Sequence, residues 1–175
     1  MRVFQQSGPN DWWSFPGSST PRNLALALVG FIGLCMLVGA SAGAITAGSV
    51  HTWYAAQHHP PGTPPDWLFA PVWTTLYILM GLAAWLVWRR RGPGRELRLW
   101  GWQLAANAMW SPAFFGLHSA AGGLVVLASL LILLGLTIAS FLKVRPVAGW
   151  LIAPYAVWTC YAAYLNLGFW WLNAT

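Results

Sequence analysis

The sequence predicts an all-α protein, an integral membrane bundle of five transmembrane helices. Of its 175 residues, 58% are hydrophobic and 7% are charged, whereas a soluble domain carries about 25% charged residues. Five apolar stretches are each long enough to cross a bilayer as a helix, which takes roughly 20 residues. The few basic residues gather in short clusters between these stretches. The composition excludes a water-facing surface, and it also excludes disorder, because a disordered chain has low hydrophobicity and high net charge.

The five predicted spans cover residues 24–50, 67–88, 97–117, 120–142 and 149–172. Pro71 and Pro146 mark span ends, while Pro112 and Pro154 lie inside spans, where neighbouring helices can satisfy the freed backbone groups. A β-barrel would need segments of about 10 residues that alternate apolar and polar side chains. Runs such as 124–136 do not alternate, so helices are predicted.

Two domains follow from the composition. Residues 1–23 contain many Gly, Ser, Pro and Asn residues and are predicted to be a flexible N-terminal tail; residues 24–175 form the transmembrane domain. The first apolar run resembles a signal peptide, with Ala40-Ser41-Ala42 in the place of a cleavage site. Because its apolar character continues to Val50, we expect the run to be retained as a span.

Basic residues set the predicted orientation. With five spans, the N-terminus, the loop between spans two and three and the loop between spans four and five share one side. That side holds all nine basic residues: Arg2, Arg22, Arg89, Arg90, Arg91, Arg95, Arg98, Lys143 and Arg145. The positive-inside rule makes it the cytoplasmic side. This placement explains the net charge of +6 by membrane orientation, and no nucleic acid partner is predicted.

Ionisable residues are missing from the middle of every predicted span, since Asp66 and Glu96 lie at span edges. Such residues mark ion paths and coupling sites in membranes, so neither an ion-coupled transporter nor an acid–base hydrolase is expected. The histidines are interpreted as exposed or interfacial residues, with a haem-iron or metal ligand as the alternative; they are His51, His58, His59 and His118. No metal site is predicted.

Aromatic and amide residues recur every three or four positions in three spans, which places them on one face of each helix. They are Trp73, Tyr77 and Met80, then Gln103, Asn107, Trp110 and Phe114, then Tyr155, Trp158, Ala162, Asn166 and Phe169. Buried amides in lipid are costly without partners, so these faces should point into the bundle. Converging faces would form a pocket for a planar ring system; ordinary helix packing is the alternative.

The loop of residues 51–66 is long for a connection between two helices. It carries Pro60, Pro61, Pro64 and Pro65, and prolines stiffen a chain without forming a helix. A stiff loop at the mouth of an aromatic bundle can act as a lid, and a plain connector is the alternative.

Short motifs occur in order along most of the chain. They are Trp53-Tyr54, His59-Pro60, Thr63-Pro64-Pro65, Trp67-Leu68-Phe69, Pro71-Val72-Trp73-Thr74, Tyr77, residues 81–89, Gln103-Leu104, Asn107, residues 110–115, Pro154-Tyr155, Trp158 and Leu165-Asn166. Together they resemble the translocator protein family, also called the tryptophan-rich sensory proteins (TspO/MBR).

The resemblance implies a five-helix bundle, usually a homodimer, that requires no cofactor and binds porphyrins such as protoporphyrin IX, and in some members haem. Together with Tyr77 from the helix faces, the expected ligand-binding residues are Tyr54, Pro64, Trp73, Asn107, Trp110, Trp158 and Ala162. Trp73 and Trp158 also match tryptophans implicated, in some members, in light-dependent porphyrin breakdown.

The chain departs from the family pattern in the loop. His59-Pro60-Pro61-Gly62 stands where the family usually has Lys-Pro-x-aromatic, which removes a cation and a ring from the expected lid. The predicted function is tetrapyrrole binding for transport, sequestration or sensing. A light-dependent porphyrin-degrading enzyme and a regulatory membrane scaffold are the alternatives.

Small residues four positions apart permit close helix approach. Gly39 and Gly43 have this spacing in the first span, and Gly101 and Ala105 have it in the third. By family analogy, we expect the third span to form the dimer contact.

Overall fold

The computed structural model describes residues 21–174, which form five long helices and three short helical turns. In chain order the elements are α1 (Pro21–Ser49), η1 (Val50–Tyr54), η2 (Asp66–Leu68), α2 (Phe69–Arg91), α3 (Arg95–Ser111), η3 (Pro112–Gly116), α4 (Ala120–Val144) and α5 (Pro146–Leu172). No strand occurs within residues 21–174, so the all-α class is confirmed. Apart from residues 21–23, which begin α1, the predicted tail lies outside the described residues.

Helix ends extend beyond the apolar stretches that predicted them. Helix α5 begins at Pro146, because proline suits the first helical position, where no backbone donor is required. Helix α2 runs on to Arg91 and stops at Gly92, whose φ of 72° is a left-handed conformation that glycine adopts without strain. The apolar stretches therefore locate the helices, while capping chemistry determines their ends.

Within residues 21–174, three helical segments are long and apolar enough to cross a membrane: Pro21–Tyr54, Asp66–Arg91 and Ala120–Val144. Helices α3 and α5 are not among them. Helix α3 has 17 residues, and α5 carries aromatic and amide side chains that lower its mean hydropathy. The chain is therefore a helical bundle with at least three segments suited to a bilayer.

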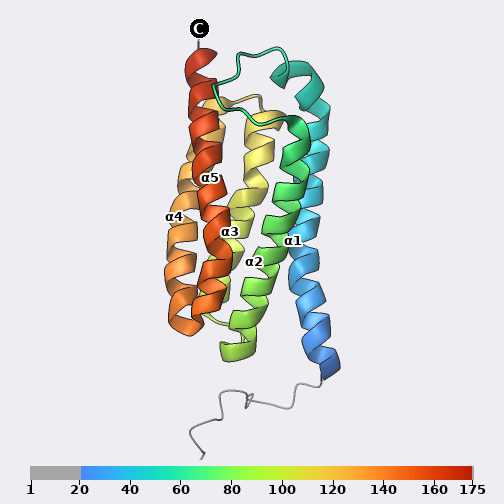
Figure 1. Ribbon diagram of the computed structural model, residues 1–175, viewed down its shortest axis with the longest axis vertical. Coiled ribbons are helices and arrows are strands. Elements are labelled where there is room, and N and C mark those ends of the chain that lie inside the picture. The colour runs from blue at the N-terminus through green and yellow to red at the C-terminus, as the bar shows by residue number, and fades with distance from the viewer. Residues whose placement is uncertain (1–20, 175) are drawn as a thin grey trace, which may run out of the picture.

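The bundle is arranged as a ring of packed helices (Figure 1). Each helix runs antiparallel to the next one along the chain, and the contacts around the ring follow the order α1, α2, α5, α4, α3. The helix ends that carry Arg22, Arg89–Arg91 and Lys143 therefore lie at one end of the bundle. The loop of residues 55–65 and the end of α5 lie at the other end.

The core lies among α2, α3, α4 and α5, and α1 packs on its side. The largest fully buried side chains include Tyr155, Phe141 and Met80. Helix α1 contributes one buried residue, Cys35. It approaches α2 closely because Gly81 has no side chain: a Cβ atom there would lie 2.7 Å from the Cα atom of Ile32.

Two π-helical turns, η1 and η3, face each other at the end of the bundle that carries the 55–65 loop. The Ser49 hydroxyl donates a hydrogen bond of 3.0 Å to the Phe115 carbonyl, which joins the two turns. The Trp53 ring stacks on the His118 ring, with centroids 4.6 Å apart. Such turns are rare and are frequent at functional sites; here they position Tyr54 and Phe114 at the edge of a cavity.

Candidate ligand-binding site

A cavity of about 520 Å³ lies among α1, α2, α3, α5 and the 55–65 loop. Its volume falls within the range of roughly 300–1,000 Å³ that is usual for small-molecule sites. The lining is mostly apolar, and aromatic rings contribute much of it. These rings are Tyr54, Phe69, Trp73, Tyr77, Trp110, Phe114, Phe115 and Phe169.

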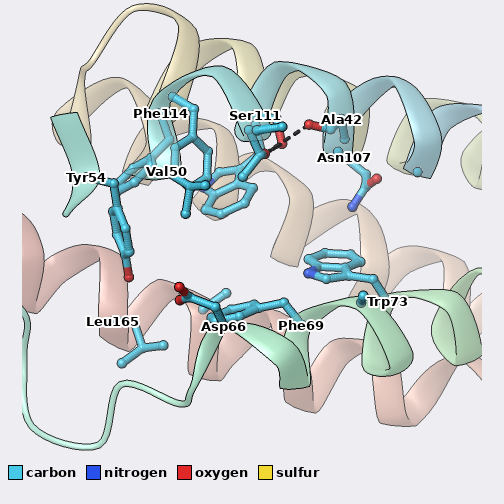
Figure 2. A pocket seen from close by; sticks show the side chains of 18 of the residues that line it. Ala42, Val50, Tyr54, Asp66, Phe69, Trp73, Asn107, Ser111, Phe114 and Leu165 are labelled. Carbon is cyan, nitrogen blue, oxygen red and sulfur yellow. Dashed lines mark hydrogen bonds between the residues drawn. The ribbon is translucent and has the colours of Figure 1, made fainter. Parts of the chain in front are cut away.

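Aromatic rings form one end of the cavity, where Figure 2 shows Tyr54 and Phe114. Tyr54 and Phe169 are nearly parallel, with an interplanar angle of 6° and centroids 5.5 Å apart. Trp110 stacks on Phe114 at the same centroid distance. Flat faces fixed in this way can contact a planar ligand at little further conformational cost.

A buried hydrogen-bonded chain closes the opposite end. The Tyr77 hydroxyl donates to Asn107 Oδ1 at 2.8 Å, and Asn107 Nδ2 donates to the Tyr155 hydroxyl at 2.7 Å. Trp73 stacks on Tyr77, with centroids 5.5 Å apart, and Figure 2 shows Trp73 and Asn107 at the same end of the cavity. These two hydrogen bonds fix the Asn107 side chain, so that its amide is a positioned polar group at the Trp73 end of the cavity.

Asn166 holds the Trp110 ring in place. The Trp110 indole N–H donates to Asn166 Oδ1 at 3.3 Å, and Asn166 Nδ2 donates to the Ala120 carbonyl at 2.8 Å. An unpartnered amide would be costly at this buried position, so both ends of Asn166 are used. The side chain thereby joins α3 to the start of α4 and to α5.

The wall supplied by α1 consists of small residues apart from Met36. The small residues are Gly39, Ala40, Ala42, Gly43, Thr46 and Ala47. A Cβ atom at Gly43 would have nothing within 4 Å, because this position faces open space. The spacing of Gly39 and Gly43 predicted close helix approach; Gly39 does meet the Tyr77 ring, whereas Gly43 leaves open space in the cavity wall.

The 55–65 loop covers one side of the cavity, where Pro60 and Thr63 line it. Three side chains of the α5 region anchor this loop. The Tyr161 hydroxyl donates to the Gly62 carbonyl and the Tyr164 hydroxyl to the Pro61 carbonyl. Asn173 accepts from the His58 N–H at 2.9 Å and donates to the His58 carbonyl at 3.0 Å. The loop therefore rests on α5 in the position that a lid would occupy.

Six of the eight residues expected at the site line the cavity: Tyr54, Trp73, Tyr77, Asn107, Trp110 and Ala162. Pro64 and Trp158 are not among the lining residues. In the loop, Pro60 and Thr63 occupy the position expected for Pro64. Trp158 is half-buried and packs against Phe69, with centroids 6.0 Å apart, and against Tyr161 at 5.6 Å.

Helical geometry explains the position of Trp158. Tyr155, Thr159 and Asn166 are buried on the inner face of α5. At 100° per residue, Trp158 lies roughly 60° from Tyr155 around the helix. Its ring therefore reaches toward the edge of α2, and of the two tryptophans considered for light-dependent chemistry only Trp73 lines the cavity.

The cavity reaches the surface between α1 and α2, where the lining residues Ala40, Ala47, Ala70 and Thr74 are exposed. Two lining side chains that can carry a charge, His51 and Asp66, are also exposed. Sequence reasoning did not assign either residue to the site. Asp66 was placed at a span edge, and only the fold shows that this edge and the end of α1 line the same cavity.

The fold and the cavity define a helical membrane protein with an aromatic-lined pocket between its helices. Residues 31–172 match the TspO/MBR family, and the chain belongs to this family.

Relatives from distant organisms match most of the chain. It is 39% identical over 154 residues to the tryptophan-rich protein TspO of Chlorobaculum tepidum, covering 86% of this chain and 96% of that protein. It is 37% identical over 158 residues to the protein CrtK of Rhodobacter capsulatus, covering 86% and 94%. It is 36% identical over 150 residues to the translocator protein of Bos taurus, covering 81% and 87%.

Proposed function

We propose that this protein binds planar tetrapyrroles, such as protoporphyrin IX or haem, in the cavity, for transport, sequestration or sensing. One observation carries the proposal: aromatic and amide side chains from separate helices line one cavity of about 520 Å³. Tyr54, Trp73 and Trp110 supply flat faces, and Asn107 supplies a hydrogen-bonding group between them.

The chemistry of the lining fits a flat apolar ring better than a compact polar substrate. Apolar atoms dominate the cavity surface, so burying a large ring there is favourable by roughly 25 cal/mol per Å² of apolar area. Aromatic rings add about 0.5–1.5 kcal/mol per stacked pair beyond burial. These contributions favour a ligand with an extended planar face.

Titration with protoporphyrin IX tests the proposal. Because the variants remove tryptophans, binding is followed by the porphyrin's own absorbance in an uncharged detergent. We expect saturable binding, and an affinity at least about tenfold lower in the Trp73→Ala, Trp110→Ala double variant, since a tenfold change corresponds to about 1.4 kcal/mol. The matched control is Trp102→Ala, Trp150→Ala, because these rings are 67% and 70% exposed and do not line the cavity. Equal affinities in folded samples of both double variants would refute the pocket.

We further propose that all five helices span the membrane, with the basic end on the cytoplasmic side. Helix α5 has 27 residues, about 40 Å at 1.5 Å per residue, and a bilayer core is about 30 Å thick. Its buried polar side chains, Thr159 and Asn166, lie on the inner face. Exposed rings such as Trp150 and Trp171 lower its hydropathy, and tryptophan is common where a span meets the membrane surface. In a variant lacking Cys35 and Cys160, a single cysteine introduced at Thr63 should react with an impermeant maleimide from outside the cell. A single cysteine at Arg91 should not.

A homodimer through α3 is also proposed. Gly101 has nothing within 4 Å of a notional Cβ atom, and Trp102 and Met109 on the same helix are exposed. Cross-linking in membranes should give a dimer that Gly101→Leu weakens. Gly135→Leu on α4 is the control, since Gly135 also has nothing within 4 Å. Loss of the dimer in both variants, or in neither, would contradict the proposed contact.

A further inference from the structure

Among the described residues, one carboxylate, that of Asp66, lines the mouth of the cavity. Asp66 begins η2 and lines the cavity, and its side chain is exposed. Figure 2 shows the carboxylate directed into the opening, on the side where the Tyr54 hydroxyl also points. The carboxylate interacts electrostatically with Tyr54 across this gap. A ligand that fills the opening would therefore meet a negative charge.

The described lysine and arginine residues lie far from this charge. They are Arg22, Arg89, Arg90, Arg91, Arg95, Arg98, Lys143 and Arg145, at the opposite end of the bundle. The 20 residues of helix that separate Phe69 from Arg89 span about 30 Å. Charges separated by more than about 8–10 Å are largely screened at physiological salt. None of these cations therefore compensates Asp66 at the mouth.

The rest of the lining offers little to an anion. Apart from His51 and Asp66, the lining side chains are apolar, hydroxyl-bearing or amide groups. The Tyr77 hydroxyl already donates to Asn107, and the Trp110 indole N–H already donates to Asn166. A free carboxylate on the ligand's edge would thus approach Asp66 with no lysine or arginine in the lining, where His51 is the other side chain that can carry a charge.

We propose that the cavity selects ligands by the charge of their edge: it favours a planar ring that presents a cation or a hydrogen-bond donor to Asp66 over one that presents a free carboxylate. This inference rests on the proposed tetrapyrrole function and specifies its ligand class. The aromatic rings and Asn107 recognise the flat core, while Asp66 discriminates among substituents. Because Asp66 is exposed, water and salt weaken the effect, and we expect about threefold to tenfold discrimination.

Three porphyrins that share one ring and differ only at its edge test this selection. They are protoporphyrin IX as the free acid, its dimethyl ester, and a derivative with two amino-terminated amide arms. Each is titrated at one fixed pH and low salt, in an uncharged detergent, into the unchanged protein, Asp66→Asn and Asp66→Lys. Glu96→Gln is the matched control, because it removes a carboxylate at the opposite end of the bundle.

In the unchanged protein we expect the cationic porphyrin to bind most tightly, the ester less tightly and the free acid most weakly. Asp66→Asn should reduce these differences, Asp66→Lys should reverse their order, and Glu96→Gln should leave them unchanged. The ester's affinity should stay nearly constant, which also shows that each variant is folded. Added salt should reduce the differences in the unchanged protein.

The outcomes distinguish a failure of the proposed tetrapyrrole function from a failure of the proposed selection by Asp66. If none of the three porphyrins binds, the proposed tetrapyrrole function is wrong. If all three bind and their order does not respond to Asp66→Asn or Asp66→Lys, the function stands and the selection by Asp66 is overturned.

Discussion

The Asn107 side-chain nitrogen lies 2.7 Å from the Tyr155 hydroxyl oxygen, and both residues are buried, with Asn107 in the cavity wall. This hydrogen bond joins α3 to α5, and the hydrogen bond from Tyr77 to Asn107 extends the connection to α2. A polar group buried inside a membrane bundle must find such partners. The same three helices carry Trp73, Trp110 and Ala162, so the hydrogen-bonded chain stabilises the geometry of the site.

Replacing Tyr155 by phenylalanine should destabilise the protein while preserving its shape. The variant removes the acceptor of the Asn107 amide, and interhelical hydrogen bonds in membranes contribute on average about 0.6 kcal/mol and at most about 1.7 kcal/mol. We expect the free energy of unfolding to fall by an amount within that range, measured by thermal or denaturant unfolding in detergent. Tyr164→Phe is the control, because Tyr164 is 52% exposed and bonds only the loop. Equal stabilities of the two variants would contradict a structural role for the buried chain.

Filling the open space beside Gly43 should block the site without unfolding the bundle. The Gly43→Leu side chain would enter the cavity, since nothing lies within 4 Å of a Cβ atom at this position. We expect porphyrin affinity to fall at least about tenfold while the unfolding temperature changes little, as measured by absorbance titration and thermal unfolding.

Gly33→Leu is the matched control for this experiment. Gly33 lies on the same helix, also has nothing within 4 Å of a Cβ atom, and does not line the cavity. Its affinity should equal that of the unchanged protein. Tight porphyrin binding by Gly43→Leu would place the ligand elsewhere on the molecule.

Releasing the loop from α5 should change the rates of binding more than the affinity. In the Tyr161→Phe, Tyr164→Phe variant, the hydrogen bonds to the Gly62 and Pro61 carbonyls are absent. Amide hydrogen exchange in residues 57–63 should then become faster, because less free energy is needed to open the loop locally. Porphyrin dissociation should also become faster. Tyr155→Phe serves as the comparison. It should lower the global free energy of unfolding, and it should not selectively accelerate hydrogen exchange in residues 57–63.

Periodicity predicted the inward amides and rings because helical spacing determines which side chains share a face. Asn107 and Trp110 lie three residues apart on α3, and both line the cavity. The same rule could not place Trp158, which lies at the edge of the inner face, where a small rotation of α5 decides between the cavity and the neighbouring helix. Side-chain spacing within one helix does not specify its rotation in the bundle.

Residues whose role depends on contacts between distant segments were not predicted. Asp66 reaches the cavity mouth because η2, which leads into α2, lines the same cavity as the end of α1, and no local pattern encodes that arrangement. The small residues around Gly43 were expected to pack against a neighbouring helix. A missing side chain, however, permits either close helix contact or open space. Gly39 shows the first outcome, with Tyr77 against it, and Gly43 shows the second.

Acid should weaken the connection between α2 and α3 through Glu96. The pKa of this carboxyl is lowered first by a hydrogen bond from its own backbone N–H and also by the Arg91 guanidinium, which lies 2.8 Å away. A carboxyl with a lowered pKa in the folded state contributes stability above its unfolded-state pKa, and this contribution disappears as the pH falls through the folded-state value. Exposed ion pairs contribute at most about 1 kcal/mol, so we expect a small effect.

The unfolding temperatures of the unchanged protein and Glu96→Gln should therefore be compared from pH 7 down to pH 3. The unchanged protein should be slightly more stable at neutral pH, and the difference should vanish in acid, where protonation removes the charge that the variant already lacks. High salt at neutral pH should shrink the difference as well, since the pair is near the surface. A difference that persists unchanged at pH 3 would show that Glu96 stabilises the α2–α3 connection by packing, and not by its charge.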